Sequence, residues 1–172
     1  MRLKELAGPE EIHAVVKELA SRINRDYAGK SPVIVCVLKG SFIFMADLVR
    51  LLEVSARVEF IKASSYGTGT ASSGSVKIDL DLDCDIAGLD VILVDDILDT
   101  GLTLNHIIGH IMQKRPGTLK LCVLLDKPAR RRVELSADYI GMEVEDKFLV
   151  GYGLDLNGEY RGLNGIFELV QE

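Results

Sequence analysis

Residues 91–104 read VILVDDILDTGLTL. The first four are large, apolar and without alternation, which is typical of a parallel strand buried on both faces. Asp95 and Asp96 come directly after them, at the end of the strand where open α/β sheets bind their ligands. The threonines and the glycine of residues 100–103 then offer hydroxyls and backbone N–H groups at the start of an amphipathic segment, which favours anion binding. This stretch predicts an α/β fold with a binding site at the strand end.

The remaining sequence alternates between strand-like and helix-like segments, which predicts a central, mostly parallel, twisted sheet flanked by helices. From about residue 138 short strand-like pieces follow one another, separated by Gly and Asp. They predict a small C-terminal subdomain (about 138–172) appended to a core (about 9–137) in a single domain, 1–172. We expect helices over 9–28, 41–52 (with Ser41 as N-cap) and 103–113, and strands over 33–38, 54–63, 76–82, 91–95, 119–125, 138–143, 148–152 and 165–170.

The composition fits a folded enzyme-sized domain. A chain of 172 residues that is 48% hydrophobic buries a substantial core. A net charge of −6 argues against a dedicated nucleic-acid binder, because affinity for the phosphate backbone rests on clustered Lys and Arg. No apolar stretch approaches the roughly 20 residues of a membrane span, and the N-terminus lacks the apolar region of a signal peptide. We expect a cytoplasmic protein without membrane or nucleic-acid partners, whose Cys36, Cys84 and Cys122 are reduced and mainly buried.

Residues 91–103 resemble the phosphoribosyl-pyrophosphate (PRPP) binding motif of the type I phosphoribosyltransferases, in which an apolar run and an acidic pair precede Asp-Thr-Gly-x-Thr. Further segments are similar to the 6-oxopurine branch of that family, the hypoxanthine-guanine phosphoribosyltransferases. They cover the chain from about Ser31 to the C-terminus, in the family's order. These segments are VLKGS at 37–41, SSYG at 64–67, DKFLVGYGLD at 146–155 and Tyr160-Arg161. The resemblance implies the family's fold, with the C-terminal subdomain as a hood over the base.

The resemblance also implies a reaction of purine salvage. N9 of hypoxanthine or guanine would displace pyrophosphate from C1 of PRPP, giving IMP or GMP. Because an acidic protein needs bridging divalent cations to hold a polyanion, Mg²⁺ is the expected cofactor. Members of the family form homodimers and homotetramers, so one of these assemblies is expected here.

The resemblance assigns PRPP-binding roles to several residues. Asp95 and Asp96 would lie by the ribose hydroxyls, directly or through metal. Lys39-Gly40, which alone would be interpreted as a surface turn, would form the pyrophosphate-binding loop, whose peptide bond in this family can be cis. Arg161 would also hold pyrophosphate. The 5′-phosphate would be wrapped by Asp99, Thr100, Gly101, Leu102 and Thr103, of which Leu102 departs from the polar or basic residue often found in the family.

The implied purine site uses residues from the second half of the chain. Asp99 would exchange a proton near N7 of the base, and Lys127 would contact the 6-oxo group. Phe148 would stack on the ring, and Leu149 would bond the base edge through its backbone. Without the resemblance, Lys127 would be an ordinary lysine at a strand end and Phe148 a core aromatic. Asp155 would contact a second metal beside the base, so the implied metal ligands are Asp95, Asp96 and Asp155.

Residues 64–75 consist almost entirely of Ser, Gly and Thr. Such a segment buries too little apolar surface to offset about 1–2 kcal/mol of backbone entropy per residue, so we expect it to be ordered only by a ligand. The resemblance makes it a lid that carries Ser65 and Tyr66. A closed lid would exclude water, the competing nucleophile.

Other interpretations remain open. The same fold could serve a regulator that senses PRPP, although such a protein would need a basic face for nucleic acid. Within the enzymes, the base could be xanthine, because ring-edge specificity rests on backbone geometry. His106 and His110 have the spacing of metal ligands on one helix, but without an evident third ligand they are better interpreted as a helix-surface pair.

Overall fold

The computed structural model describes residues 2–65 and 76–170. It confirms a mostly parallel sheet flanked by helices. Of the predicted lid, only Ser64 and Ser65 belong to the described part, where they end a strand, and Tyr66 lies outside it. No helix among the described residues is long and apolar enough to cross a membrane.

The main sheet has six strands in the order β4-β3-β2-β5-β6-β7. Neighbouring strands run parallel except β4, which is antiparallel to β3 at one edge. Sequence and structure agree on most of these elements to within a few residues. The bounds are β2 (Val33–Leu38), β3 (Arg57–Ser65), β4 (Val76–Leu80), β5 (Asp90–Leu98), β6 (Thr118–Asp126) and β7 (Tyr139–Glu143).

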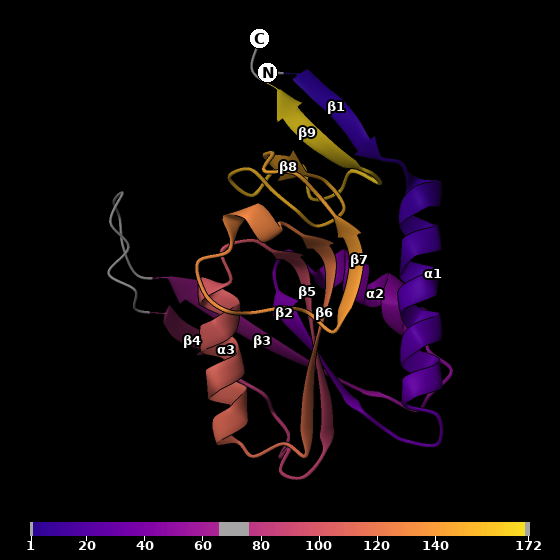
Figure 1. Cartoon of the computed structure of the whole chain (residues 1–172), viewed down its shortest axis with the longest axis vertical. Helices are drawn as coiled ribbons and strands as arrows, with labels where there is room; N and C mark the ends of the chain where they lie inside the picture. Colours follow the sequence, from indigo (N-terminus) through magenta and orange to yellow (C-terminus); the bar gives the residue numbers. More distant parts are fainter. Residues whose placement is uncertain (1, 66–75, 171–172) are drawn as a thin grey trace.

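Three helices cover the two faces of this sheet (Figure 1). Helices α1 (Pro9–Asp26) and α2 (Phe42–Arg50) pack on one face, and α3 (Leu102–Gln113) packs on the other. Alternate residues of β5 serve the two faces, since Ile92 belongs to the apolar cluster of α1 and α2, and Leu93 to that of α3. Burial on both faces explains why the central strands are continuous apolar runs.

Strand β5 is longer than the sequence predicted. It continues past the acidic pair and stays paired with β6 as far as Leu98 and Asp126. The expected end at residue 95 was therefore wrong. The acidic residues keep the strand conformation because β6 continues to pair with β5 beyond them.

The hood contains a second sheet, which joins the two ends of the described chain. Its order is β1-β9-β8, with bounds β1 (Arg2–Ala7), β8 (Leu149–Val150) and β9 (Ile166–Val170). The sequence did not predict β1, whose residues are mostly exposed and whose pairing partner, β9, lies at the far end of the chain. Segment 138–143, expected in the C-terminal subdomain, instead forms β7 at the edge of the main sheet, because it pairs in parallel with β6.

Ser41 precedes α2 as expected, but its side chain does not cap the helix. The hydroxyl instead donates a hydrogen bond back to the carbonyl of Val37 and lies 3.2 Å from the Cys36 sulfur. The buried Ser41 thus fixes the turn between β2 and α2 rather than the first turn of α2.

The three cysteines are free, and they differ in environment. Burial raises the pKa of Cys36 to about 11 and that of Cys122 to about 12. Cys84 is half-buried outside the sheet, and its pKa is raised less. Since the thiolate is the reactive form, Cys84 is the most reactive of the three.

We therefore predict that iodoacetamide at pH 8 modifies Cys84 in the native protein while Cys36 and Cys122 react only on unfolding. Peptide mass spectrometry after timed alkylation, with and without urea, measures this. Alkylation of Cys36 or Cys122 at the rate of Cys84 in the native protein would contradict the burial described here.

Candidate active site

The candidate site lies where β2 and β5 separate. Their parallel pairing ends at Cys36 and Val94, while β2 continues along β3 and β5 continues along β6. The connection after β2 crosses one face of the sheet through α2, and that after β5 crosses the other through α3. This reversal is the switch point at which open α/β sheets bind ligands, beyond the carboxyl ends of their strands.

The acidic pair lines the β5 side of this crevice. Asp96 is only 9% exposed and Asp95 is half-buried. The Asp96 N–H donates to Asp95 Oδ1 over 2.9 Å, and the Ile97 N–H donates to Asp96 Oδ1 over 2.8 Å. Burial, together with the charge of Asp96, raises the pKa of Asp95 well above its ordinary value, and burial also raises the pKa of Asp96 despite the nearby Arg161. A cation beside the pair would favour both ionised forms.

The donor set fits Mg²⁺ at this pair, because carboxylate oxygens are the ligands that this ion prefers. No cluster of three or more His, Cys, Asp or Glu residues forms within 2–65 and 76–170. Asp155 therefore does not join Asp95 and Asp96 in one metal cluster. A small hard cation that keeps several waters is compatible with two protein carboxylates.

The β2 side of the crevice is the turn that contains Lys39 and Gly40. The Leu38–Lys39 peptide bond is cis. A Cβ atom at Gly40 would lie 1.8 Å from Asp96 Oδ2, so the turn packs directly against the acidic pair. A Cβ at Gly153, whose φ is +101°, would lie 2.0 Å from the Gly40 carbonyl oxygen. Two glycines thus allow the hood, the turn and the acidic pair to stack.

Arg161 and Asp155 hold the hood side of this stack. Arg161 Nη2 lies 2.7 Å from Asp155 Oδ1, and Nη1 donates to the Gly153 carbonyl over 2.6 Å. The other carboxylate oxygen of Asp155 accepts the Gly158 N–H over 2.6 Å. The charge of Arg161 also acts on Asp96, which lowers the pKa of that carboxyl against the effect of burial. The structure therefore brings Arg161 toward the acidic pair through Gly153 and Gly40.

The loop between β5 and α3 ends in a tight turn at the start of the helix. Gly101 adopts φ +80° and is buried, and its carbonyl accepts the Asn105 N–H over 2.8 Å. Thr103 and Leu102 are exposed at the first turn of α3, where backbone N–H groups are free of helical partners. Leu102 is thus placed to act through its backbone.

An arginine that the sequence analysis missed supports this loop from behind. Arg131 Nη1 donates to the carbonyls of Leu98, over 3.0 Å, and of Asp99. Its other amino group pairs with Asp126 at the end of β6, and both side chains are largely buried. Arg131 therefore ties the ends of β5 and β6 together. The run of three arginines at 130–132, which is separated from Lys127 by only two residues, was the available signal.

The predicted purine residues gather on the other side of the loop. Lys127 follows β6, is only 6% exposed, and its amine donates to the Lys147 carbonyl over 2.5 Å. Phe148 is 52% exposed, unlike a core aromatic. Leu149 is buried in β8 opposite Glu168, so that its backbone begins a strand of the hood. The amine of Lys127 thus reaches the backbone of the residue that directly precedes Phe148.

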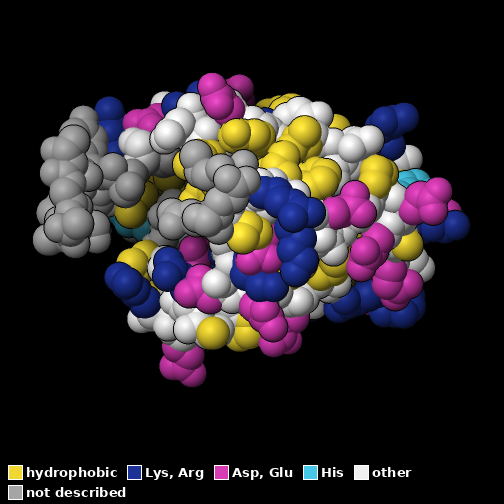
Figure 2. Space-filling view, turned by 90° about the horizontal axis from the view of Figure 1, so that it is seen from above, with side chains coloured by type: hydrophobic (Ala, Val, Ile, Leu, Met, Phe, Trp, Pro, Cys, Tyr) yellow, Lys and Arg dark blue, Asp and Glu magenta, His cyan; other side chains and the backbone are white. Residues whose placement is uncertain are grey.

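Asp99 lies between the phosphate loop and the purine residues. Arg130, the last residue of the 3-10 helix η1 (Pro128–Arg130), places its Nε 3.0 Å from Asp99 Oδ1. In the space-filling view from above, basic and acidic side chains lie next to one another (Figure 2).

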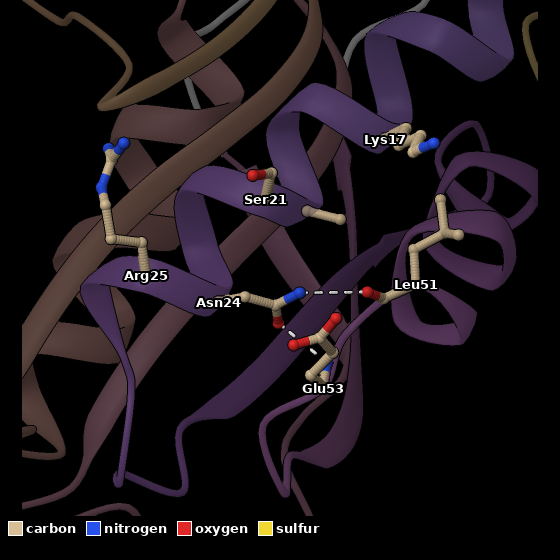
Figure 3. Close-up of a pocket in the computed structure, with 7 residues that line it drawn as sticks. Lys17, Ser21, Asn24, Arg25, Leu51 and Glu53 are labelled. Atoms are coloured by element: carbon tan, nitrogen blue, oxygen red, sulfur yellow. Dashed lines mark hydrogen bonds between the residues drawn. The ribbon is translucent and has the colours of Figure 1, made fainter.

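Two other features lie apart from this site. A hollow of about 490 Å³ between α1 and the end of α2 contains Lys17 and Glu53 but none of the predicted site residues (Figure 3). In it the Asn24 amide bonds the Leu51 carbonyl and the Glu53 N–H, so it holds the end of α2. His106 is exposed on α3, and His110 is half-buried with its Nε2 2.9 Å from Asp81 Oδ2.

The chain matches known proteins over most of its length. Residues 4–157 match the model of the phosphoribosyl transferase domain. A hypoxanthine-guanine phosphoribosyltransferase from Aquifex aeolicus is 54% identical over 160 residues, which are 92% of this chain and 89% of that protein. The chain belongs to the hypoxanthine-guanine phosphoribosyltransferase family. A hypoxanthine phosphoribosyltransferase from Escherichia coli is 44% identical to this phosphoribosyltransferase over 96% of this chain and 95% of the other.

Solved structures agree with this assignment. A hypoxanthine-guanine phosphoribosyltransferase from Bacillus anthracis superposes with a TM-score of 0.94 at 46% identity, covering 98% of this chain and 100% of that chain. The Trypanosoma cruzi hypoxanthine phosphoribosyltransferase in complex with the product IMP superposes with a TM-score of 0.90 at 45% identity, over 97% and 94% of the two chains.

The close approach of Gly40 to Asp96 generates a prediction. Gly40→Ala forces the turn or the carboxylate to move, so we expect the free energy of unfolding to fall by about 1–3 kcal/mol, as for overpacking elsewhere. Gly109→Ala is the control, because a Cβ at this position of α3 meets no atom within 4 Å and alanine favours helix. Urea unfolding of both variants measures the difference. An equal stability of the two variants would mean that the turn does not press on Asp96.

Proposed function

We propose that this chain transfers the 5-phosphoribosyl group of PRPP to N9 of hypoxanthine or guanine, giving IMP or GMP and pyrophosphate, in purine salvage. One observation carries the proposal: the acidic pair Asp95 and Asp96 lies at the switch point of the sheet, between the turn at Lys39 and Gly40 and the loop that precedes α3. The enzymes to which the chain is similar carry the same activity in their names.

The PRPP-binding residues divide according to the group they contact. The loop from Asp99 to Thr103 receives the 5′-phosphate on its backbone N–H groups. The turn at Lys39 and Gly40, with Arg161 from the hood, receives the pyrophosphate. Asp95 and Asp96 face the ribose hydroxyls between these two anion sites.

Mg²⁺ bound to PRPP and to the acidic pair would neutralise charge on the departing pyrophosphate. Asp155, on the hood side, is the proposed ligand of a second ion. The protein supplies the rest: Lys39 and Arg161 stabilise the negative charge that grows on the leaving group, and the carboxylates near the ribose offset its growing positive charge.

The purine is held by groups that also prepare it for attack. Phe148 stacks on its face and the backbone of Leu149 bonds its edge. The Lys127 ammonium contacts the 6-oxo group, where it stabilises negative charge as the base loses a proton. Asp99 accepts that proton near N7, a contribution of typically 10²–10⁴-fold. Ser65 and Tyr66 belong to the proposed lid, most of which lies outside the described residues.

Two other functions could use the same fold: a regulator that senses PRPP, and a transferase for a different purine. A PRPP-sensing regulator would need a cationic face for nucleic acid, whereas the net charge is −6 and acidic side chains are interleaved with the basic ones. A transferase for xanthine or another purine differs only at the ring edge. The assay below distinguishes these cases.

We also propose a cytoplasmic homodimer or homotetramer. The three free cysteines support a reducing compartment. Val58 and Phe60 lie on one face of β3 and are 39% and 43% exposed, which is unusual for side chains of this size at a sheet and supports a contact between subunits. Light scattering that gave the monomer mass of 18.9 kDa at micromolar concentration would refute self-association.

The decisive experiment mixes the protein, PRPP and one purine base at a time, and follows nucleotide formation by chromatography. We expect IMP and GMP to form with Mg²⁺ and not with excess EDTA, because two buried carboxylates cannot bind a polyanion alone. The double variant Asp95→Asn with Asp96→Asn should lose PRPP binding. Turnover in EDTA, or wild-type PRPP affinity in the double variant, would refute the metal and ribose assignment, and XMP as the main product would change the substrate.

A second prediction concerns Asp99→Asn, which keeps the size and hydrogen bonding of the side chain but removes the proton acceptor. We expect kcat to fall by roughly 10²-fold or more, with little change in PRPP affinity. Single-turnover measurements isolate the chemical step. An unchanged single-turnover rate would remove Asp99 from proton transfer.

A further inference from the structure

Arg130 connects two segments of the site that are distant in sequence. Its Nε lies 3.0 Å from Asp99 Oδ1 and 3.6 Å from Asp146 Oδ1. Asp99 opens the loop that receives phosphate, and Asp146 stands two residues before Phe148. A single guanidinium therefore lies between the phosphate loop and the purine-binding segment.

The charges require this arrangement. Asp99 and Asp146 would repel each other without a cation between them, since both carboxylates approach the same nitrogen. The hydrogen bond to Asp99 and the charges of Asp99 and Asp146 raise the pKa of the Arg130 guanidinium, so it stays protonated at any working pH. Arg130 is held by η1, which begins directly after Lys127, so its backbone is fixed close to the purine site.

We propose that Arg130 is a positioning residue for the transfer step: it holds the Asp99 carboxylate in place and ties it to segment 146–148, so that the proton acceptor and the base move as one unit. This inference rests on the proposed role of Asp99. In this role Arg130 acts through the two carboxylates that it contacts.

The ion pairs of Arg130 are solvent-exposed, which argues for a role in the reaction rather than in folding. The side chains of Arg130, Asp99 and Asp146 are 41%, 38% and 54% exposed, and exposed ion pairs contribute little to folding. Arg131 next to it is different, because its pair with Asp126 is largely buried and closes the sheet end. Loss of the Arg130 charge should leave the fold intact and change the reaction, since a catalytic group displaced by about 1 Å can lose about 10²-fold in rate.

The test compares single-turnover rates and steady-state kinetics, with Mg²⁺ present, for Arg130→Gln, Arg130→Lys, Asp99→Asn and the double variant Arg130→Gln with Asp99→Asn. Arg132→Gln is the matched control, because this neighbouring arginine is exposed and takes part in no ion pair within the described ranges. Thermal melting of each variant checks that the fold is kept.

We expect Arg130→Gln to lower kcat by about 10-fold or more with little change in KM for PRPP, as for a misplaced catalytic group. Arg130→Lys should recover most of the rate, because the ammonium keeps the charge between the carboxylates. In the Asp99→Asn background, Arg130→Gln should cause no further loss, since the two residues act as one unit. Arg132→Gln should match the wild type.

Three other outcomes are informative, and each refutes a different claim. If Asp99→Asn slows the chemical step but Arg130→Gln does not, the positioning role is wrong and the role of Asp99 stands. If the losses of the two variants multiply in the double variant, Arg130 acts independently of Asp99 and the inference is overturned. If Asp99→Asn itself has no effect, the proposed proton transfer fails, and the positioning role fails with it.

Discussion

The separation of β2 from β5 after Cys36 and Val94 determines the shape of the site. Up to these residues the strands form one ladder, buried under α1 and α2 on one face and under α3 on the other. Beyond them the two backbones diverge, because each remains paired with its outer neighbour. The wedge that opens is lined by the turn at Gly40 and by Asp96, and the remaining elements are arranged around it.

The hood, the turn after β2 and the acidic pair touch one another at two glycines, where a side chain would not fit. Gly40 lies against the carboxylate of Asp96, and Gly153 of the hood lies against the carbonyl of Gly40. Packing this close makes the hood part of the site rather than an appendage. It also keeps Asp95 and Asp96 poorly solvated, which is why their pKa values are raised and why a bridging cation suits them.

The cations of the site are held by backbone carbonyls as well as by carboxylates. Lys127 bonds the carbonyl of Lys147, Arg131 bonds those of Leu98 and Asp99, and Arg161 bonds that of Gly153. The bonds of Lys127 and Arg131 join segments that are distant in the sequence. The bond of Arg161 fixes a turn within the hood. Arg131 and Arg161 are also paired with Asp126 and Asp155, so the carbonyl bonds mainly fix the direction in which these side chains point.

Local patterns were sufficient to predict the central strands, the three helices and the turn that precedes α3, because burial on both faces, helical periodicity and a Thr-Gly-x-Thr turn act over a few residues. The acidic pair was identified for the same reason. The residues of the hood could be assigned roles only through resemblance, since nothing in the composition of Phe148 or Arg161 distinguishes a ligand contact from a core or surface residue.

Long-range pairing decided what the sequence could not show. Strand β1 exists because β9, from the opposite end of the chain, supplies its ladder, and β5 extends to Leu98 because β6 runs beside it. Arg131 supports the loop after β5, and Arg130 contacts both Asp99 and Asp146. These contacts join residues 16 to 33 positions apart, and they form only once the sheet has formed. The sequence by itself determined the central strands, the three helices and the acidic pair, through local burial and periodicity, whereas the tertiary structure alone decided which charges meet, because that depends on the order of strands in the sheet.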